Sequence, residues 1–299
     1  MKLEKFGDRL AQRMLPIVAL AAILLLGGCA YLTPRSEPAL AQSQTLLRQQ
    51  HQSAQAQLRQ SASSRLWFAG FAMHSQSHAF QGDLDAVSAL LTRHFPAVIA
   101  LRFSNELQSR ELRYPFATAI SLRSTLAYIG QHAHAQDKVV LFLTTHGSKG
   151  FLNVNIGNTP FPSVRDADLA QWLEPLGDRP TLIVLSACHA GSFIPALARA
   201  NRVIYTAASA ERNSFGCSFT DRITFFVEEF LVRDFDPQRS LQELFDAGRI
   251  RIAEREQKLN YLPSEPSSSV GAAVRAWAET PFSGWLKPQS SRARAQQSS

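Results

Sequence analysis

The chain has 299 residues, of which 45% are hydrophobic and 18% charged, a balance that excludes collagen, a coiled coil and a wholly disordered protein. It carries three cysteines and neither a C-x-x-C nor an H-E-x-x-H motif, so we expect no disulfide scaffold, no zinc site and no other cofactor. The net charge of +7 is dispersed, without a dense Lys/Arg run, which argues against a nucleic-acid partner.

The N-terminus is typical of an exported protein. Basic residues precede an uncharged apolar stretch, residues 15–26, which is shorter than the roughly 20 residues of a membrane-spanning helix. The motif LGGC at residues 26–29 resembles the lipobox of bacterial lipoproteins, which implies that residues 1–28 are removed and that Cys29 is acylated. Ala30, rather than Asp, follows the cysteine, which resembles lipoproteins that are sorted to the outer membrane and not to the inner membrane. We therefore expect a lipid-anchored protein of the bacterial cell envelope that faces the periplasm; the alternative is an ordinary signal peptide or an uncleaved anchor.

Three further segments follow Cys29. Residues 29–64 are rich in Gln, Ser and Ala, which predicts a flexible tether that forms helix only transiently. Residues 287–299 are polar and basic without apolar periodicity, which predicts a disordered tail. Residues 65–286 lie between them and are predicted to form one folded domain.

This domain alternates short apolar runs with amphipathic segments. Strands are predicted for residues 66–72, 97–103, 139–143, 181–185 and 203–207. Helices are predicted from a cap at Asp83, over residues 116–132, from Asp166 or Asp168 through Trp172, from Thr220 through Phe230, and behind the capping-box pair Ser240 and Glu243. The continuous apolar runs 139–143 and 181–185 are typical of neighbouring central strands. The pattern predicts an α/β fold with a mostly parallel sheet, helices on both faces, and sites at the carboxyl ends of the strands.

Both central runs end in reactive side chains. His146 follows the first run with Gly147 directly behind it, and Cys188 follows the second with Gly191 close behind. A nearby imidazole lowers the pKa of a thiol, and the amides of Gly147 and Cys188 can point at a developing oxyanion. A lone buried cysteine is usually inert and a lone histidine is usually a satisfied polar group. Their occurrence together at two strand ends favours catalysis.

These segments carry a resemblance to a known family. Residues 141–150 (LFLTTHGSKG) and 183–192 (IVLSACHAGS) resemble the two signatures of the legumain-like cysteine peptidases of the caspase/gingipain clan, which include the GPI-anchor transamidase. The resemblance implies a three-layer caspase-like fold, a peptide or protein substrate and no metal. It also implies that His146 is the general acid/base, Cys188 the nucleophile and Gly147 an oxyanion donor.

The same resemblance gives candidate substrate-binding residues. Residues 205–211 resemble the family's substrate-lining strand and loop, which makes Ser209 and Glu211 candidates. Ser186 stands where legumains have an acidic residue that helps to line the pocket for asparagine, so an asparagine preference does not carry over. Asp221 stands near the place of another acidic pocket residue.

The remaining histidines and cysteines receive structural interpretations. His189 is a neighbour of Cys188 along the chain and is expected to point away from the sulfur. Cys217 is interpreted as a buried or idle thiol; the alternative in an oxidising periplasm is a disulfide with Cys188, which would switch activity off. Four histidines are interpreted as solvated loop residues and not as metal ligands: His74, His78, His132 and His134.

The sequence therefore predicts a membrane-anchored cysteine endopeptidase. Two alternatives stay open. One is a binding lipoprotein that keeps the fold without turnover, and the other is a transpeptidase or transamidase of the same family.

Overall fold

The computed structural model describes residues 36–60, 64–107 and 111–286. The predicted signal peptide, the predicted acylation site Cys29 and the predicted tail over residues 287–299 lie outside the described residues. Within the described ranges, no helix combines the length and the apolar character needed to cross a bilayer.

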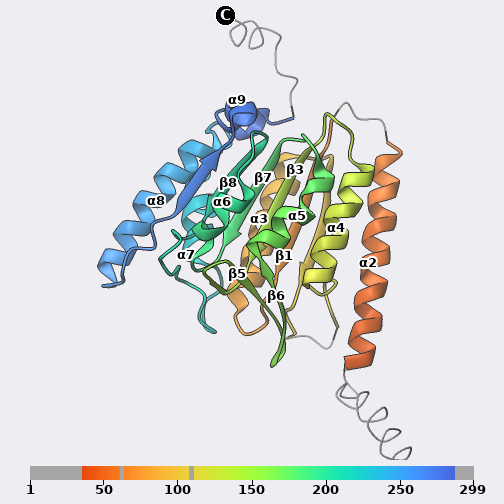
Figure 1. The fold of residues 1–299 in the computed structure, drawn as a ribbon, viewed down its shortest axis with the longest axis horizontal. Helices are drawn as coiled ribbons and strands as arrows, with labels where there is room; N and C mark the ends of the chain where they lie inside the picture. Colours follow the sequence, from red (N-terminus) through yellow and green to blue (C-terminus); the bar gives the residue numbers. More distant parts are fainter. Residues whose placement is uncertain (1–35, 61–63, 108–110, 287–299) are drawn as a thin grey trace, which may run out of the picture.

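A six-stranded sheet forms the centre of the molecule, in the order β2-β1-β3-β7-β8-β9 (Figure 1). All neighbouring pairs are parallel except β8 and β9. The strands are β1 (Leu66–Ala72), β2 (Val98–Ser104), β3 (Lys138–Thr144), β7 (Thr181–Ser186), β8 (Arg202–Thr206) and β9 (Ser267–Val270). The apolar runs predicted the five parallel strands to within about a residue, and β3 and β7 are central neighbours as expected.

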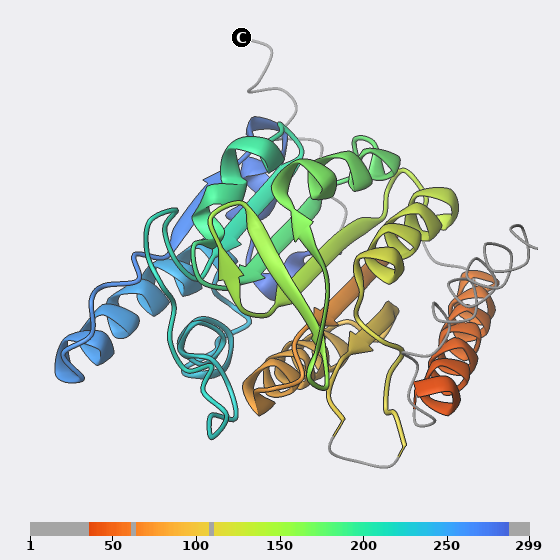
Figure 2. The same cartoon turned by 60° about the horizontal axis from the view of Figure 1, so that its bottom comes forward.

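A second, three-stranded antiparallel sheet follows directly on the central strand β3. It consists of β4 (Gly147–Ser148), β5 (Phe151–Ile156) and β6 (Thr159–Arg165). Figure 2 shows this sheet in front of the carboxyl ends of the parallel strands. The sequence analysis did not predict it, because β5 and β6 are partly exposed with mixed sequences and β6 contains two prolines.

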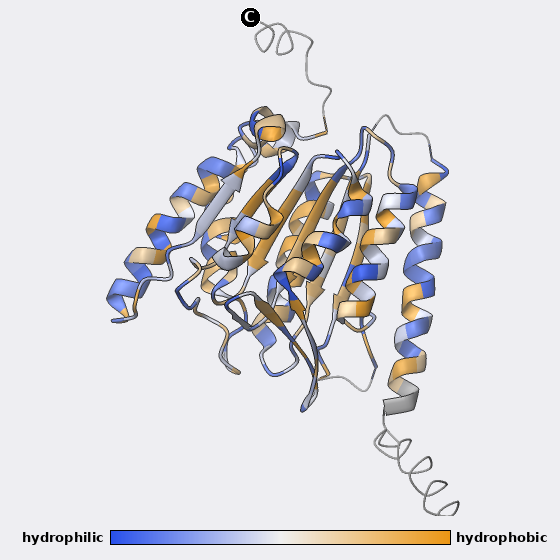
Figure 3. Cartoon of the chain, viewed as in Figure 1, coloured by the Kyte–Doolittle hydropathy of each residue, from blue (hydrophilic) through white to orange (hydrophobic). Residues whose placement is uncertain are grey.

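Helices cover both faces of the central sheet, so the predicted three-layer α/β architecture is confirmed. One face carries α3 (His78–His94), α7 (Phe225–Val227) and α8 (Leu241–Lys258), and the other carries α4 (Ala119–His132), α5 (Asp166–Trp172) and α6 (Ile194–Leu197). Side chains of β3 alternate between the two cores, with Phe142 in the first and Leu141 in the second. Figure 3 shows the apolar strands between helices whose outer faces are polar.

Short helical turns complete the chain. They are η2 (Glu174–Leu176), η3 (Ala190–Phe193), η5 (Ala272–Val274), η6 (Phe282–Gly284), the π-helical turn η4 (Glu228–Val232) and α9 (Arg275–Ala278).

Three helices begin elsewhere than predicted. Helix α4 begins three residues later, at Ala119, with Thr118 as its cap. Helix α3 begins at His78, because the hydroxyl of Ser77 accepts the backbone N–H of Ala79 at 3.2 Å and caps it. Asp83 is therefore no cap and lies inside the helix. Helix α7 begins at Phe225 with Thr224 as its cap, five residues later than expected. The predicted capping box of Ser240 and Glu243 is confirmed at the start of α8.

The segment predicted to be a flexible tether contains helix α2 (Ser36–Leu58). The Gln50 amide covers the free edge of β2: its Nε2 donates to the carbonyl of Arg102 at 2.9 Å, and its Oε1 accepts that residue's N–H at 2.7 Å. Ser43 accepts the N–H of Phe116 at 2.9 Å, and Ala54 is buried. The prediction of a flexible tether rested on the high content of polar Gln and Ser. In the structure, two of these polar side chains make the contacts that hold the helix against the domain.

Candidate active site

The carboxyl ends of three neighbouring strands carry reactive side chains at matching positions. Parallel pairing of β1, β3 and β7 ends at an aligned trio: Ala72, Thr144 and Ser186. Two residues beyond the ends of these three strands lie His74, His146 and Cys188, respectively. Side chains two positions apart along a strand direction share a face, so this register directs the three groups to one edge of the sheet.

The strand ends that carry His146 and Cys188 are in direct contact. The N–H of Thr145 donates to the carbonyl of Ser186 at 3.1 Å, which extends the ladder beyond the last pair. A Cβ at Gly147 would lie 2.5 Å from the carbonyl oxygen of Cys188. Only glycine allows the two backbones to approach this closely. The predicted proximity of the two central strand ends is therefore present in the structure.

His146 is held by aromatic packing. Its ring lies edge-to-face against His74, with centroids 4.6 Å apart, and against Phe80, at 5.0 Å. Burial lowers the pKa of His146 below its usual value of 6.5. The lowered pKa keeps the ring a neutral imidazole at neutral pH. The side chain is partly exposed, which gives the ring access to the edge of the sheet. A neutral imidazole is the form that accepts a proton from a thiol.

Cys188 is partly exposed, and its sulfur contacts Ser214 in the loop over residues 213–224, which we call the cap loop. The N–H of Ser214 donates to Sγ at 3.3 Å, and the carbonyl and hydroxyl oxygens of Ser214 lie 3.6 Å from it. This contact was not predicted from the sequence.

The turn after Cys188 is locked against residues 208–212. His189 has a φ of 56°. Its N–H donates to the carbonyl of Arg212 at 2.8 Å, and its Nδ1 lies 3.0 Å from the carbonyl oxygen of Ala210. A Cβ at Gly191 would lie 2.8 Å from the nitrogen of Ala210. The His189 ring is thus engaged with this segment.

Two of the substrate-binding candidates lie on that segment and form surface contacts. The hydroxyl of Ser209 donates to Glu265 at 3.2 Å. Glu211 forms an ion pair with Lys149, which lowers the pKa of the exposed Glu211 carboxyl. Both side chains border the turn that follows Cys188.

The other two candidates lie elsewhere. Ser186 is buried, and its hydroxyl lies 3.2 Å from Asp83, beneath the edge rather than on its surface. Asp221 lies in the cap loop and accepts the N–H and the hydroxyl of Ser218, both at 2.7 Å. Its carboxylate thus orders this loop.

Cys217 also belongs to the cap loop. It is a free thiol, as is Cys188. Burial, followed by the nearby Cys188 and Asp221, raises the pKa of Cys217 to about 12. Cys217 is therefore a protonated thiol close to the candidate nucleophile.

Sequence reasoning missed His74 and Asp83. His74 was interpreted as a solvated loop residue, and this is wrong: it packs on His146, and burial together with that neighbour lowers its pKa to about 4. The signal was available, because His74 follows its strand at the same offset as His146 and Cys188 follow theirs. Asp83 was interpreted as a helix cap and is completely buried beneath the edge.

Another histidine that was interpreted as a solvated loop residue, His132, belongs to a helix. His132 lies at the end of α4, where its Nδ1 is 2.8 Å from the carbonyl oxygen of Tyr128 and its ring stacks on Tyr128. Across the part of the chain that the structure describes, no three His, Cys, Asp or Glu side chains are grouped so that they could hold a metal ion.

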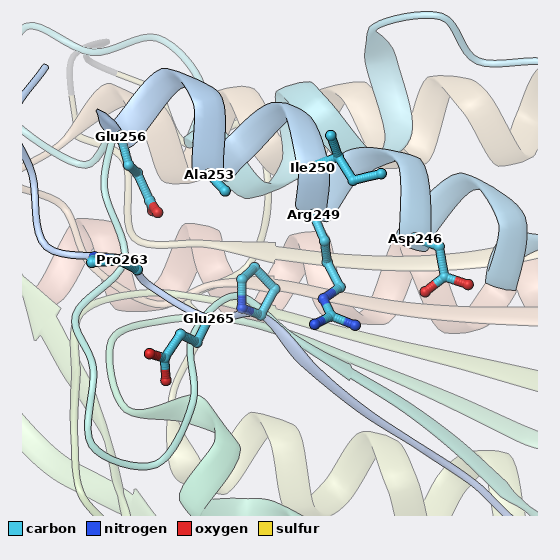
Figure 4. Close-up of a pocket in the computed structure, with 8 residues that line it drawn as sticks. Asp246, Arg249, Ile250, Ala253, Glu256, Pro263 and Glu265 are labelled. Carbon is cyan, nitrogen blue, oxygen red and sulfur yellow. The ribbon is translucent and has the colours of Figure 1, made fainter. Parts of the chain in front are cut away.

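A groove of about 490 Å³ lies between α8 and the segment before β9 (Figure 4). Its lining includes Arg249, Ile250 and Glu256 from the helix and Pro263 and Glu265 from the facing segment. Neither His146 nor Cys188 lines it. We assign the candidate active site to the strand ends, because the reactive groups lie there.

A histidine and a cysteine on adjoining carboxyl ends of a mostly parallel sheet are an arrangement typical of cysteine peptidases. Residues 129–275, which contain both side chains, match the model of the Peptidase C13 family, and this match supports a legumain-like cysteine peptidase family. The crystal structure of caspase-1 from Spodoptera frugiperda is similar, with a TM-score of 0.47 and 15% identity, over 69% of this chain and 85% of that one. No curated protein matches the chain.

Proposed function

We propose that the protein is a membrane-anchored cysteine endopeptidase in which Cys188 is the nucleophile and His146 the general acid/base. The observation that carries the proposal is the contact between the two strand ends, where Gly147 lies against the carbonyl of Cys188. This contact joins the two strand ends that carry the cysteine and the histidine, which supports a dyad.

In the proposed mechanism His146 takes the thiol proton and the Cys188 sulfur attacks the carbonyl carbon of a peptide bond. The amides of Gly147 and Cys188 stabilise the oxyanion, and His146 then protonates the leaving amine. Water hydrolyses the acyl-enzyme and restores the thiol. Burial of His146 supports this cycle, because it favours the neutral imidazole in the resting state.

The test compares the two described cysteines. We expect an acyloxymethyl-ketone peptide probe to label the wild type and Cys217→Ala, and not Cys188→Ala, with the thermal stability of both variants nearly unchanged. Cys217 is a matched control, because it is a neighbouring thiol whose raised pKa keeps it protonated. Labelling of Cys188→Ala at the wild-type rate would refute the assignment.

Two alternatives give different products with the same protein. If an amine replaces water, the protein is a transpeptidase or transamidase, and hydroxylamine-trapped products will appear. If no peptide of a library is cleaved at any pH tested, the protein is a binding lipoprotein. One observation favours the latter: Ser186 replaces the family's acidic residue, and its hydroxyl is turned inward to Asp83.

We further propose that acylated Cys29 anchors the protein to the outer membrane, facing the periplasm. Helix α2 supports an orientation of the domain relative to the membrane. Ser43, near the start of α2, accepts a hydrogen bond from the N–H of Phe116, which follows the carboxyl end of β2 (Figure 1). Ser36 follows Cys29 by seven positions, a stretch of chain that spans at most about 25 Å. An anchor at Cys29 would therefore attach at the end of the molecule that carries the strand ends. Radiolabelled palmitate should enter the wild type and not Cys29→Ser.

A further inference from the structure

Asp83 is a buried acid that the proposed mechanism leaves unused. It lies in α3 and is 0% exposed. Its Oδ2 accepts the hydroxyl of Thr144 at 2.7 Å and the hydroxyl of Ser186 at 3.2 Å. Its Oδ1 accepts the N–H of Thr224 at 2.9 Å, and the Thr224 hydroxyl lies 3.0 Å from Oδ2. One carboxyl group thus joins α3 to β3, to β7 and to the start of α7.

The two strand contacts fall at informative positions. Thr144 and Ser186 are paired with each other at the end of the ladder between β3 and β7. Each lies two residues before a proposed catalytic side chain, His146 in one strand and Cys188 in the other. A change in the position of the Asp83 carboxyl would therefore move both strand ends, and with them the distance between imidazole and sulfur.

The third contact concerns the cap loop, whose Ser214 touches the Cys188 sulfur. Asp83 holds Thr224 at the end of this loop. Helix α3 holds the loop at a second point, where the Ser77 hydroxyl donates to the carbonyl of Ser218 at 2.8 Å. It approaches the loop at a third, because a Cβ at Gly82 would overlap a backbone carbonyl oxygen of the loop.

The groups around Asp83 are hydrogen-bond donors and not cations, so its contacts orient the donors and do not pair charges. Four donors face the carboxyl group: the hydroxyls of Thr144, Ser186 and Thr224 and the N–H of Thr224. Four is the number that an ionised carboxylate accepts. Asp83 forms no ion pair with any described residue. Burial raises its pKa to about 7, so the site is costly for a charged group and its polar contacts are directional.

We propose that Asp83 is a positioning residue that fixes the histidine-bearing strand end, the cysteine-bearing strand end and the cap loop in one arrangement. The inference rests on the proposed function, because it assigns Asp83 a role in that active site. Asp83 does not touch the substrate. It acts through the hydroxyl and backbone groups that it binds.

The test measures the reactivity of Cys188 directly. Iodoacetamide alkylation of Cys188, followed by peptide mass spectrometry across pH 5 to 10, reports the thiolate fraction, which depends on the neighbouring imidazole. In the isosteric variant Asp83→Asn, an amide NH2 replaces one carboxylate oxygen, so it faces a hydrogen-bond donor and cannot accept its hydrogen bond. We expect its Cys188 alkylation rate at pH 7 to fall about tenfold with an upward shift of the thiol titration, and kcat for a peptide substrate to fall in parallel with KM changed less than about twofold.

Controls separate positioning from general loss of structure. Ser88→Ala removes another buried hydroxyl of α3, which contacts Arg102 and not the strand ends, and it should keep wild-type reactivity. If Asp83→Asn does not fold, Ser186→Ala and Thr144→Val decide the question, since each removes one strand contact and is expected to slow alkylation several-fold.

The outcomes also separate this inference from the proposed function. A folded Asp83→Asn, or folded Ser186→Ala and Thr144→Val in its place, with wild-type alkylation of Cys188 overturns the inference. Absence of peptide turnover in the wild type overturns the proposed function only, because the alkylation comparison still reads the arrangement of Cys188 and His146.

Discussion

Replacement of Asp83 by Asn should make the protein less sensitive to pH. The pKa of Asp83 rises from 3.8 to about 7, because burial disfavours the charged form more than its hydrogen bonds favour it. Below pH 4 the folded and unfolded states both hold the proton, so the acid imposes no pH-dependent penalty. As pH rises from 4 to 7, the unfolded chain releases the proton first and the folded state loses stability.

The size of this loss follows from the same values. Each pKa unit corresponds to about 1.4 kcal/mol, so the wild type should lose about 4 kcal/mol between pH 4 and pH 8 relative to Asp83→Asn. Urea melts of both proteins across this range measure the difference, and subtraction removes the contributions of all shared groups. A difference that stays constant with pH, or that grows as pH falls, would refute the reasoning.

Further substitutions test other contacts of the site and the fold. For His146→Ala we expect hydrolysis of a peptide to fall by orders of magnitude, and near-normal turnover would move the base to another group. His74→Phe should keep at least half of the activity, whereas His74→Arg should lose at least about tenfold, because a fixed positive charge opposes formation of the His146 imidazolium; equal turnover of the two variants would contradict this. Gly147→Ala should lower both activity and stability, the latter by about 1–3 kcal/mol in urea melts, because its Cβ would overlap the Cys188 carbonyl. Gln50→Ala should cost about 1–3 kcal/mol in the same assay without changing kcat, and an unchanged midpoint would show that the edge contact contributes nothing.

The fold was predictable wherever a segment is buried on both faces. Continuous apolar runs defined β3 and β7, and side-chain chemistry defined the start of α8 at Ser240. The hairpin of β5 and β6 and the edge strand β9 have partly exposed, mixed sequences, so their pairing depends on the elements beside them. Helix α2 has a weak apolar stripe and is stabilised by contacts with distant residues, which periodicity does not reveal.

The site was predictable to the extent that parallel strands deliver their ends together. That rule places His146 and Cys188 from their strands alone. It applies equally to His74, whose strand was identified but whose offset was not used. Asp83 and Ser214 come from a helix and a loop, and their approach to the strand ends depends on how those elements pack. Sequence spacing carries no information on that packing.

Helix α2 has a practical consequence for handling the protein. Gln50 occupies the backbone groups of Arg102 at the edge of the sheet, where another strand would otherwise pair. A chain shortened to begin at Arg65 would keep every strand and both reactive side chains, but would leave β2 uncovered. Such a truncated protein should self-associate through that strand and precipitate as its concentration rises, while the chain that retains Ser36–Leu58 stays dispersed.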